Sequence, residues 1–245
     1  MVELPLDQRS ASLSECGRRR VNQDAVLVEA LPGGAELVVV ADGMGGHSGG
    51  EIASSHALAA VRAALAADDD LVNAVRVANV AVYEKANASA DFQGMGTTLV
   101  GLFRRGAKYS IVNVGDSRAY RVDAAGIRQL TEDHSFIADA MRSGTFSIEE
   151  AEKSPWRNAV TRSVGTDPDL EVDCFGPFDA NEPHAVVLLT DGVYRTLSDD
   201  ELWRMIISAP RPDEAVRAVV SAAFESGSDD NISVALVQFG PQPTR

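Results

Sequence analysis

The longest apolar runs in this chain have the length of β-strands rather than of helices. Four segments consist almost entirely of aliphatic and β-branched residues, and they lie at 36–42, 97–103, 185–191 and 232–239. Such runs predict buried strands. Two further segments, 108–116 and 118–123, alternate more between apolar and polar residues. They predict a hairpin that is partly exposed on one face.

Helical spacing of apolar residues appears in at least three other places. The apolar positions that show it are Leu58, Val61 and Leu65, then Leu71, Val75, Ala78 and Val82, and finally Val216, Val219, Val220 and Ala223. Strands and helices therefore follow one another in blocks. This order favours an α+β fold built in layers over a strictly alternating, doubly wound sheet. Because no repeat or linker divides the chain, we expect a single domain.

Composition narrows the class of protein. The 245 residues are 45% apolar and 24% charged, as in soluble globular proteins. No stretch approaches the roughly 20 apolar residues that cross a bilayer, and the N-terminus lacks the pattern of a signal peptide, so we expect a cytoplasmic protein without a membrane partner. The formal net charge of −14 argues against a nucleic-acid partner. Two cysteines are too few for a disulfide framework.

Aspartates recur where the apolar segments start or stop. They are Asp24, Asp42, Asp116, Asp191 and Asp230. If these ends gather at one edge of the sheets, the carboxylates repel one another unless a cation joins them. Oxygen ligands without a His or Cys pattern favour magnesium or manganese over zinc. A single Asp-Gly after a strand is usually only a turn, so the residues alone leave both interpretations open.

A set of motifs in a fixed order resembles the metal-dependent protein phosphatase family, the protein phosphatase 2C (PPM) type, most closely its bacterial branch. The motifs are "GRRRVNQD", "VVVADGMGGHSGGE", "GMGTTLV", "VGDSRAY", "LTEDHS", "TRSVG", "LLTDGVYRTLSDDEL" and "SDDNISVALV". The resemblance runs from about Ala11 to Phe239. It implies an αββα sandwich, in which two packed antiparallel sheets are flanked by helices.

The same resemblance implies a metal centre with two core ions, Mn²⁺ or Mg²⁺. Its ligands correspond to Asp24, Asp42, the carbonyl of Gly43, Asp191 and Asp230, and Asp42 is expected to bridge the ions. Asp116 matches a ligand of a third, weaker ion that shares Asp191. Within "GSDDN", Asp229 is then a solvated neighbour of the ligand.

Arg19, five residues before Asp24, matches the arginine that binds the substrate phosphate in this family. Arg18 and Arg20 flank it, so a shift of one position stays open, as does a solvated turn carrying all three. The implied reaction is in-line attack on phosphorus by a hydroxide held between the ions. Asp42, Asp191 and Arg19 are the expected catalytic residues, and no phosphoenzyme forms.

The chain departs from the family pattern at several positions. Met44 stands where eukaryotic relatives have a histidine that acts as general acid, and the nearby His47 is out of register. Gln23 replaces a glutamate that holds a metal-bound water in many members. The segment 142–158 matches the flap beside the metal centre, and Ser154 replaces a frequent histidine there. We expect His134 to have a structural role.

We therefore expect a protein serine/threonine phosphatase that acts on phosphorylated proteins and opposes a bacterial Ser/Thr kinase. We divide the chain into an N-terminal extension (1–10), one catalytic domain (11–239) and a short tail (240–245), and we expect a monomer. Two alternatives are a phosphoprotein-binding pseudophosphatase and a metal-dependent phosphodiesterase. The acidic composition and the five intact carboxylates speak against them.

Overall fold

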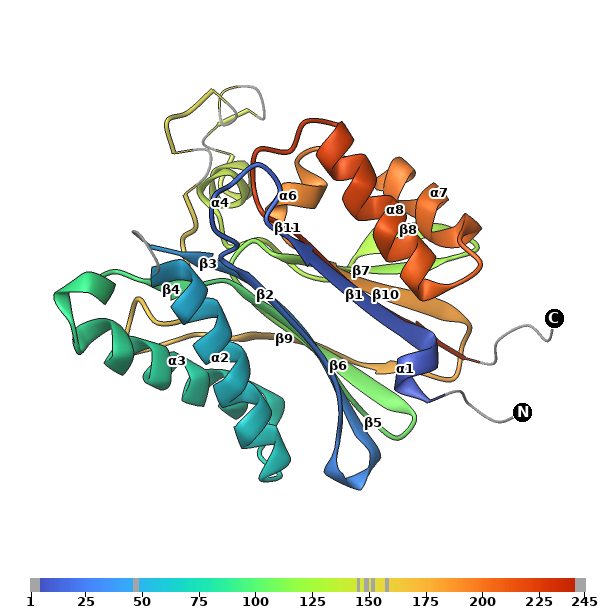
Figure 1. Ribbon diagram of the computed structural model, residues 1–245, viewed down its shortest axis with the longest axis horizontal. Coiled ribbons are helices and arrows are strands. Elements are labelled where there is room, and N and C mark those ends of the chain that lie inside the picture. Colours follow the sequence, from blue (N-terminus) through green and yellow to red (C-terminus); the bar gives the residue numbers. More distant parts are fainter. Residues whose placement is uncertain are drawn as a thin grey trace.

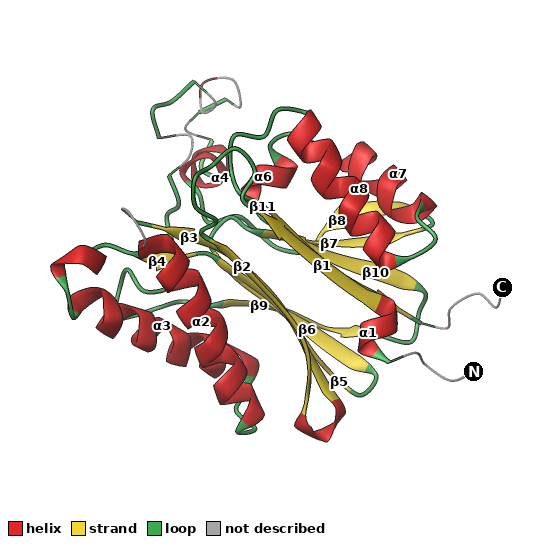
Figure 2. Cartoon of the chain, in the orientation of Figure 1, coloured by secondary structure: helices red, strands yellow, loops and turns green. Residues whose placement is uncertain are grey.

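Two antiparallel β-sheets pack face to face, and helices cover the outer face of each sheet (Figure 1). The computed structural model describes residues 5–45, 49–144, 146–147, 150, 153–156 and 159–240. Figure 2 shows the same layers by secondary structure, with strands in the middle and helices outside. The predicted αββα sandwich is confirmed. No helix in these residues is both long enough and apolar enough to span a membrane.

The first sheet has five strands. Their spatial order is β1 (Ser10–Glu15), β11 (Ile232–Phe239), β10 (His184–Leu189), β7 (Arg118–Asp123) and β8 (Gly126–Gln129). The second sheet has six strands. Five of them follow the order β2 (Asp24–Leu31), β3 (Ala35–Met44), β5 (Leu99–Arg105), β6 (Lys108–Val114) and β9 (Asp173–Asp179), and the sixth, the short β4 (Gly96–Thr97), pairs with β3. Every pairing between these strands is antiparallel.

The helices divide between the two outer faces. The second sheet is covered by α2 (Gly49–Ala66) and α3 (Leu71–Asn87), and the first by α7 (Asp199–Ser208) and α8 (Pro212–Glu225). The shorter helices are α1 (Leu6–Arg9), α4 (Phe136–Arg142), α6 (Asp191–Tyr194) and two 3₁₀ turns at Pro32–Gly34 and Ala90–Phe92. The three predicted helical periodicities all fall on buried faces of α2, α3 and α8.

Three apolar layers hold the sandwich together, and they explain the unbroken apolar runs. In β3, Val38 and Val40 face the other sheet, whereas Leu37 and Val39 face α2 and α3. The strands β10 and β11 divide their side chains in the same way between the sheet interface and α7 and α8. Successive side chains of a strand point to opposite faces of the sheet. When both faces are covered, every position is buried and the sequence of the strand is apolar throughout.

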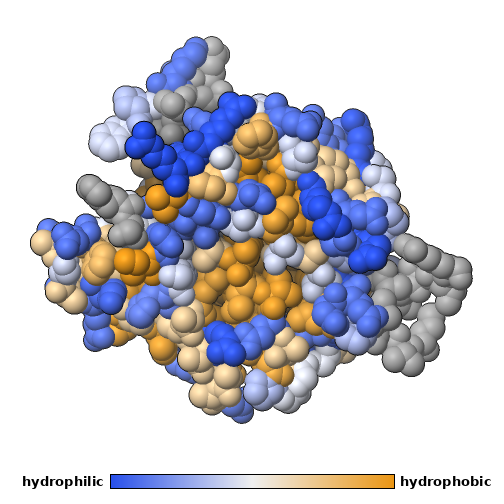
Figure 3. Space-filling view, viewed as in Figure 1, coloured by the Kyte–Doolittle hydropathy of each residue, from blue (hydrophilic) through white to orange (hydrophobic). Residues whose placement is uncertain are grey.

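The outer strands β1 and β2 lie on the same side of the sandwich. This is the side that faces the viewer in Figure 3, where apolar side chains gather over the centre of the molecule. Val26 and Val28 of β2 are partly buried against the layer between the sheets. Both strands therefore leave one backbone edge without a partner strand in the part of the chain that is described.

The predicted hairpin of 108–116 and 118–123 is wrong. The strand β6 pairs with β5 and β9 in one sheet, while β7 pairs with β10 and β8 in the other. The three residues between them, Gly115 to Ser117, cross from sheet to sheet instead of turning back. Gly115 has φ +103°, and a Cβ there would lie 2.6 Å from the side chain of Thr98, so the crossing requires glycine.

Two predicted strands also end differently. The apolar run 97–103 is interrupted at Thr98, between β4 and β5. The run 185–191 ends as a strand at Leu189, and Asp191 begins α6. An acidic side chain in the first turn of a helix is favoured by the partial positive charge of the free N–H groups. Asp191 is thus the first residue of a helix rather than the last of a strand.

The N-terminal segment makes contacts of its own with the sandwich. Arg9 in α1 is buried, forms an ion pair with Glu36 and donates to the carbonyl oxygen of Gln238 over 3.0 Å. β1 begins at Ser10. At the other end, the N–H of Gly240 donates to the carbonyl oxygen of Ala180, and residues 241–245 lie outside the described part.

Candidate metal centre

One end of the sandwich gathers the strand termini that carry the aspartates. Asp24, at the start of β2, pairs in register with Asp42 near the end of β3. In the other sheet the end of β10 lies beside the start of β11, with Leu189 opposite Val234. Asp191 and Asp230 flank these two ends in the sequence. The antiparallel registers therefore bring side chains from distant parts of the chain to one edge, which is the condition under which the sequence favours a cation site.

The hydroxyl of Thr190 holds the carboxylate of Asp24, and the hydroxyl of Thr98 holds the backbone of Asp42. The hydroxyl of Thr190, directly after β10, donates to Asp24 Oδ2 over 2.9 Å, and this bond joins the two sheets. The N–H of Asp42 donates to Thr98 Oγ1 over 2.9 Å, and the Asp42 carbonyl accepts from Thr98 N–H. Sequence reasoning missed both threonines because their role appears only when the sheets pack.

Asn231 holds the loops around the fourth aspartate, and it was also missed. Its Oδ1 accepts from the N–H of Gln23 over 2.8 Å, while its Nδ2 donates to the carbonyl oxygens of Cys16 and Val21. Its own N–H donates to Asp230 Oδ1 over 2.8 Å. One side chain thereby positions the segment before β2 against the segment before β11. Its place directly after Asp230 in "SDDN" was the available signal.

Burial and mutual repulsion raise the pKa values of three of the carboxyl groups, those of Asp24, Asp42 and Asp191. Burial raises the pKa of Asp24 to about 7, and Asp191 and Asp230 add to the shift, although hydroxyl hydrogen bonds oppose it. The pKa of Asp42 lies well above its ordinary value, through burial and then through the charge of Asp24. Burial raises the pKa of Asp191 as well, against the attraction of Arg195. A cation would relieve this repulsion.

Three observations fit a divalent ion at this place. Asp191 Oδ1 is buried and has no hydrogen-bond partner among the described residues. A Cβ on Gly43 would lie 2.0 Å from the carbonyl oxygen of Gly50, so the close backbone approach requires glycine. All the candidate ligands are oxygen atoms, which hard ions prefer. Within the described ranges, however, no three His, Cys, Asp or Glu side chains already stand as ligands of one ion.

Arg19 lies against this cluster, whereas Arg18 packs elsewhere. One guanidinium nitrogen of Arg19 donates to Asp230 Oδ2 over 2.8 Å, and Nε donates to the carbonyl oxygen of Asp229 over 2.7 Å. Arg18 instead lies over the ring of Phe224. About half of the Arg19 side chain is exposed, so the guanidinium is open to a ligand. This placement favours Arg19 over a register shifted to Arg18.

Asp116 is buried on the crossing between the sheets, next to the other acids. Burial and the charge of Asp191 raise its pKa to about 6. Its Oδ2 lies 3.5 Å from a guanidinium nitrogen of Arg195, and the same nitrogen lies 2.9 Å from Asp191 Oδ2. Asp116 and Arg195 also line a cavity of about 1060 Å³ that reaches α4. Arg195 was not among the predicted site residues.

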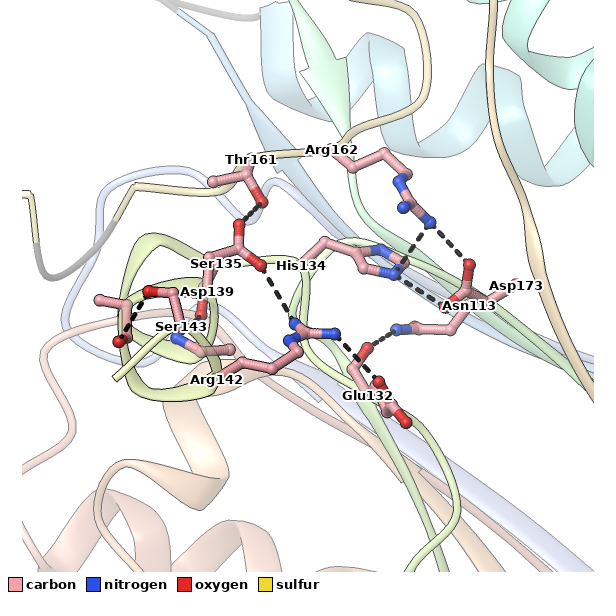
Figure 4. Close-up of polar contacts among 12 residues, drawn as sticks. Asn113, Glu132, His134, Ser135, Asp139, Arg142, Ser143, Thr161, Arg162 and Asp173 are labelled. Atoms are coloured by element: carbon pink, nitrogen blue, oxygen red, sulfur yellow. Dashed lines mark hydrogen bonds and ion pairs between the residues drawn. The ribbon is translucent and has the colours of Figure 1, made fainter. Parts of the chain in front are cut away.

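His134 holds this crossing by a hydrogen bond to Gly115, as expected for a structural histidine, and Figure 4 shows its contacts with Arg162 and Asp173. Its Nδ1 accepts from the N–H of Gly115 over 3.0 Å, which leaves Nε2 as the nitrogen that faces Asp173 Oδ2 at 3.1 Å. Arg162 donates to the other oxygen of Asp173 over 2.7 Å. Burial lowers the pKa of His134, in keeping with a neutral ring. The histidine thus positions the residue that precedes Asp116.

The positions at which the chain departs from the family pattern lie close to the centre. Met44 ends β3 and is half-buried. The backbone carbonyl oxygen of Gln23 accepts hydrogen bonds from the N–H of Gly43 and from the hydroxyl of Ser54. His47 lies outside the described residues, as do parts of the expected flap. Ser154 in that flap accepts from the N–H of Trp156.

A family model and several known proteins match this chain. Residues 14–235 match the family model described as Protein phosphatase 2C. The serine/threonine phosphatase stp of Listeria monocytogenes is 33% identical over 213 residues, covering 82% of this chain and 84% of its own length. Protein phosphatase PhpP of Streptococcus pneumoniae is 31% identical over 240 residues, covering 94% of this chain and 97% of its own.

A solved structure has the same fold. The serine/threonine phosphatase of S. agalactiae superposes with a TM-score of 0.88 at 30% identity, over 96% of this chain and all of that one. The family match spans most of the sequence, and the chain folds into the two sheets that the resemblance implied. The chain therefore belongs to the protein phosphatase 2C family of metal-dependent protein phosphatases.

Proposed function

We propose that this protein hydrolyses phosphoserine and phosphothreonine in other proteins with the help of Mn²⁺ or Mg²⁺. The observation that supports this best is the single edge at which Asp24, Asp42, Asp191 and Asp230 meet beside Arg19. We further propose a cytoplasmic monomer whose partners are phosphorylated proteins, either a bacterial Ser/Thr kinase or the substrates of that kinase.

The chain supplies the ligands for two core ions. We assign this role to Asp24, Asp42, the carbonyl of Gly43, Asp191 and Asp230. When bound, divalent ions neutralise phosphate charge and make hydroxide available near neutral pH as the nucleophile. The protein contributes the positions of these oxygens. Asp191 offers Oδ1, which has no hydrogen-bond partner in the described part of the chain, while its Oδ2 pairs with Arg195, and Thr190 holds the orientation of Asp24.

Arg19 would hold the substrate phosphate. Its contact with Asp230 Oδ2 is an ion pair at a half-exposed site, so it costs little to exchange. If Asp230 binds an ion, the guanidinium of Arg19 is released from Asp230 Oδ2. Its planar nitrogens can then donate to two non-bridging phosphate oxygens. Nε stays fixed by the carbonyl oxygen of Asp229. Met44 has no proton to give, so the leaving alkoxide takes its proton from another donor.

Hydrolysis of a phosphothreonine peptide tests this proposal. We expect release of inorganic phosphate in Mn²⁺ and its loss in EDTA. Asp191→Asn should abolish turnover because it removes a ligand charge, whereas the matched variant Asp229→Asn should keep it, because the Asp229 side chain is exposed and only its backbone holds Arg19. Activity that survives both EDTA and Asp191→Asn would refute metal-dependent hydrolysis at this edge. Binding of the peptide without turnover would instead indicate a pseudophosphatase.

A further inference from the structure

A guanidinium group stands between two of the buried carboxylates. One nitrogen of Arg195 lies 2.9 Å from Asp191 Oδ2 and 3.5 Å from Asp116 Oδ2. The short helix α6 creates the first contact, because Asp191 opens it and Arg195 follows four residues later, with its N–H on the Asp191 carbonyl. Residues four apart lie on the same face of a helix. The chain therefore places the positive charge of Arg195 next to both Asp191 and Asp116.

These two acids are the pair that the family resemblance assigns to a third, weaker ion. Arg195 already supplies one positive charge to them. A divalent ion between the same oxygens would lie beside the guanidinium, and like charges at such a distance repel strongly away from bulk water. Entry of an ion therefore requires Arg195 to leave both carboxylates. The two core ions do not require this, because the ion pair uses Asp191 Oδ2, whereas Asp191 Oδ1 has no hydrogen-bond partner among the described residues.

The cavity makes Asp116 and Arg195 accessible from solvent, so lack of access would not keep an ion from them. Asp116 and Arg195 both line the cavity of about 1060 Å³, and the Arg195 side chain is about one third exposed. A hydrated ion could reach this place from solvent. Another cation of the cavity wall, Arg118, has different partners: it donates to both carboxylate oxygens of Asp133, and its guanidinium carbon lies 3.7 Å from the centre of the Tyr194 ring. Arg195 is thus the cavity arginine that faces Asp116.

We propose that Arg195 takes the place of the third metal ion and limits this protein to a two-ion centre. The inference rests on the proposed function, since it presumes the two core ions. The side chain then has a positioning role: it holds Asp116 and Asp191 by a charge that does not depend on the metal concentration. Activity should accordingly rise with Mn²⁺ in a single phase, without a second phase at higher concentration.

The test is the number of Mn²⁺ ions bound per chain, measured by equilibrium dialysis and elemental analysis over increasing free Mn²⁺. We expect two ions for the wild type and three for Arg195→Gln, which leaves the two carboxylates without their cation. Asp116→Asn in the Arg195→Gln background should return the count to two. Arg142→Gln is the matched control, because Arg142 lines the same cavity but pairs with Glu132 and Asp139.

Each outcome separates this inference from the proposed function. Three ions on the wild type, or no extra ion on Arg195→Gln, would overturn the role of Arg195. Fewer than two ions on the wild type would instead overturn the two-ion centre, while the difference of one ion between the two proteins still tests Arg195. Circular dichroism checks that the variants fold. Should Arg195→Gln not fold, Arg195→Met, which removes the charge and keeps most of the side-chain length, should bind three ions, whereas Arg195→Lys, which keeps the charge, should bind two; equal counts for these two variants would overturn the role of Arg195.

Discussion

The raised pKa of Asp24 makes a prediction about stability in the absence of metal. An aspartate in an unfolded chain has a pKa of 3.8, whereas burial and its acidic neighbours raise that of Asp24 to about 7 in the folded protein. The stability that this shift contributes is fully present below the unfolded pKa and is lost as the pH rises through the folded pKa. The metal-free protein should therefore become less stable between pH 4 and pH 7.

The size of this loss follows from the shift. From pH 5 to about pH 7, Asp24 is protonated in the folded protein and ionised in the unfolded chain. Above pH 7 it is ionised in both states, so the loss of stability accumulates over about two pH units. At about 1.4 kcal/mol for each unit, Asp24 alone should cost about 3 kcal/mol of the free energy of unfolding. For a chain of 245 residues this corresponds to a decrease in melting temperature of roughly 5–11 °C. Asp42 and Asp191 act in the same direction.

Thermal and urea unfolding of EDTA-treated protein at pH 5 and pH 8 measures this effect. Asp24→Asn is the control, because it removes the titrating group and leaves the buried histidines unchanged. The variant should be the more stable protein at pH 8, and its advantage should shrink by about 3 kcal/mol at pH 5. Saturating Mn²⁺ should stabilise the wild type more at pH 8 than at pH 5, because ligands must lose their protons. A wild type that gains no stability from pH 8 to pH 5 relative to Asp24→Asn would refute the reasoning.

Three other substitutions test separate parts of the site. Arg19→Lys should lower kcat/KM for a phosphothreonine peptide by about 10- to 100-fold, through loss of a charge-assisted hydrogen bond of about 1.5–3 kcal/mol, while Arg18→Lys should not; equal effects would contradict the assignment. Gly43→Ala forces a Cβ to 2.0 Å from a carbonyl oxygen, so urea unfolding should show a loss of about 1–3 kcal/mol and calorimetry weaker Mn²⁺ binding; an unchanged protein would disprove the tight approach. His134→Ala leaves a buried N–H without its acceptor and should cost about 1–3 kcal/mol of stability in the same unfolding measurement; a neutral effect would exclude the structural role.

The layers of the fold could be predicted because burial on two faces leaves a direct mark on the sequence. The strands β3, β10 and β11 are covered by a sheet on one side and helices on the other, so their apolar runs are unbroken. An edge strand lacks this mark. β1 has the sequence "SASLSE" and pairs only with β11, and no apolar run predicted it.

The hairpin error has a physical reason as well. Neighbouring strands joined by a few residues usually pair with each other, and the sequence between β6 and β7 contains a glycine that suits a tight turn. Whether such a glycine turns the chain back or passes it to the other sheet depends on what packs around it. Here Thr98 contacts the crossing and His134 accepts its N–H.

Residues of the candidate site could be predicted from the sequence where the chemistry of one residue is enough to single it out. They were missed where their role depends on how distant segments pack together. The aspartates at the ends of apolar runs could be found because their charge is out of place there. Thr190 and Asn231 act through single hydrogen bonds between distant segments, which no local pattern shows. Arg195 stands between these cases, since its spacing of four residues from Asp191 predicts a helical ion pair. Its contact with Asp116 depends on how the two sheets pack.

Anomalous diffraction from crystals grown in Mn²⁺ tests the central claim most directly, because the signal locates manganese itself. We expect two peaks at the edge where Asp24, Asp42, Asp191 and Asp230 meet, each with carboxylate oxygens about 2 Å away, and none between Asp116 and Arg195. The absence of manganese from this edge at saturating concentration, or peaks only elsewhere on the acidic surface, would contradict a catalytic metal centre.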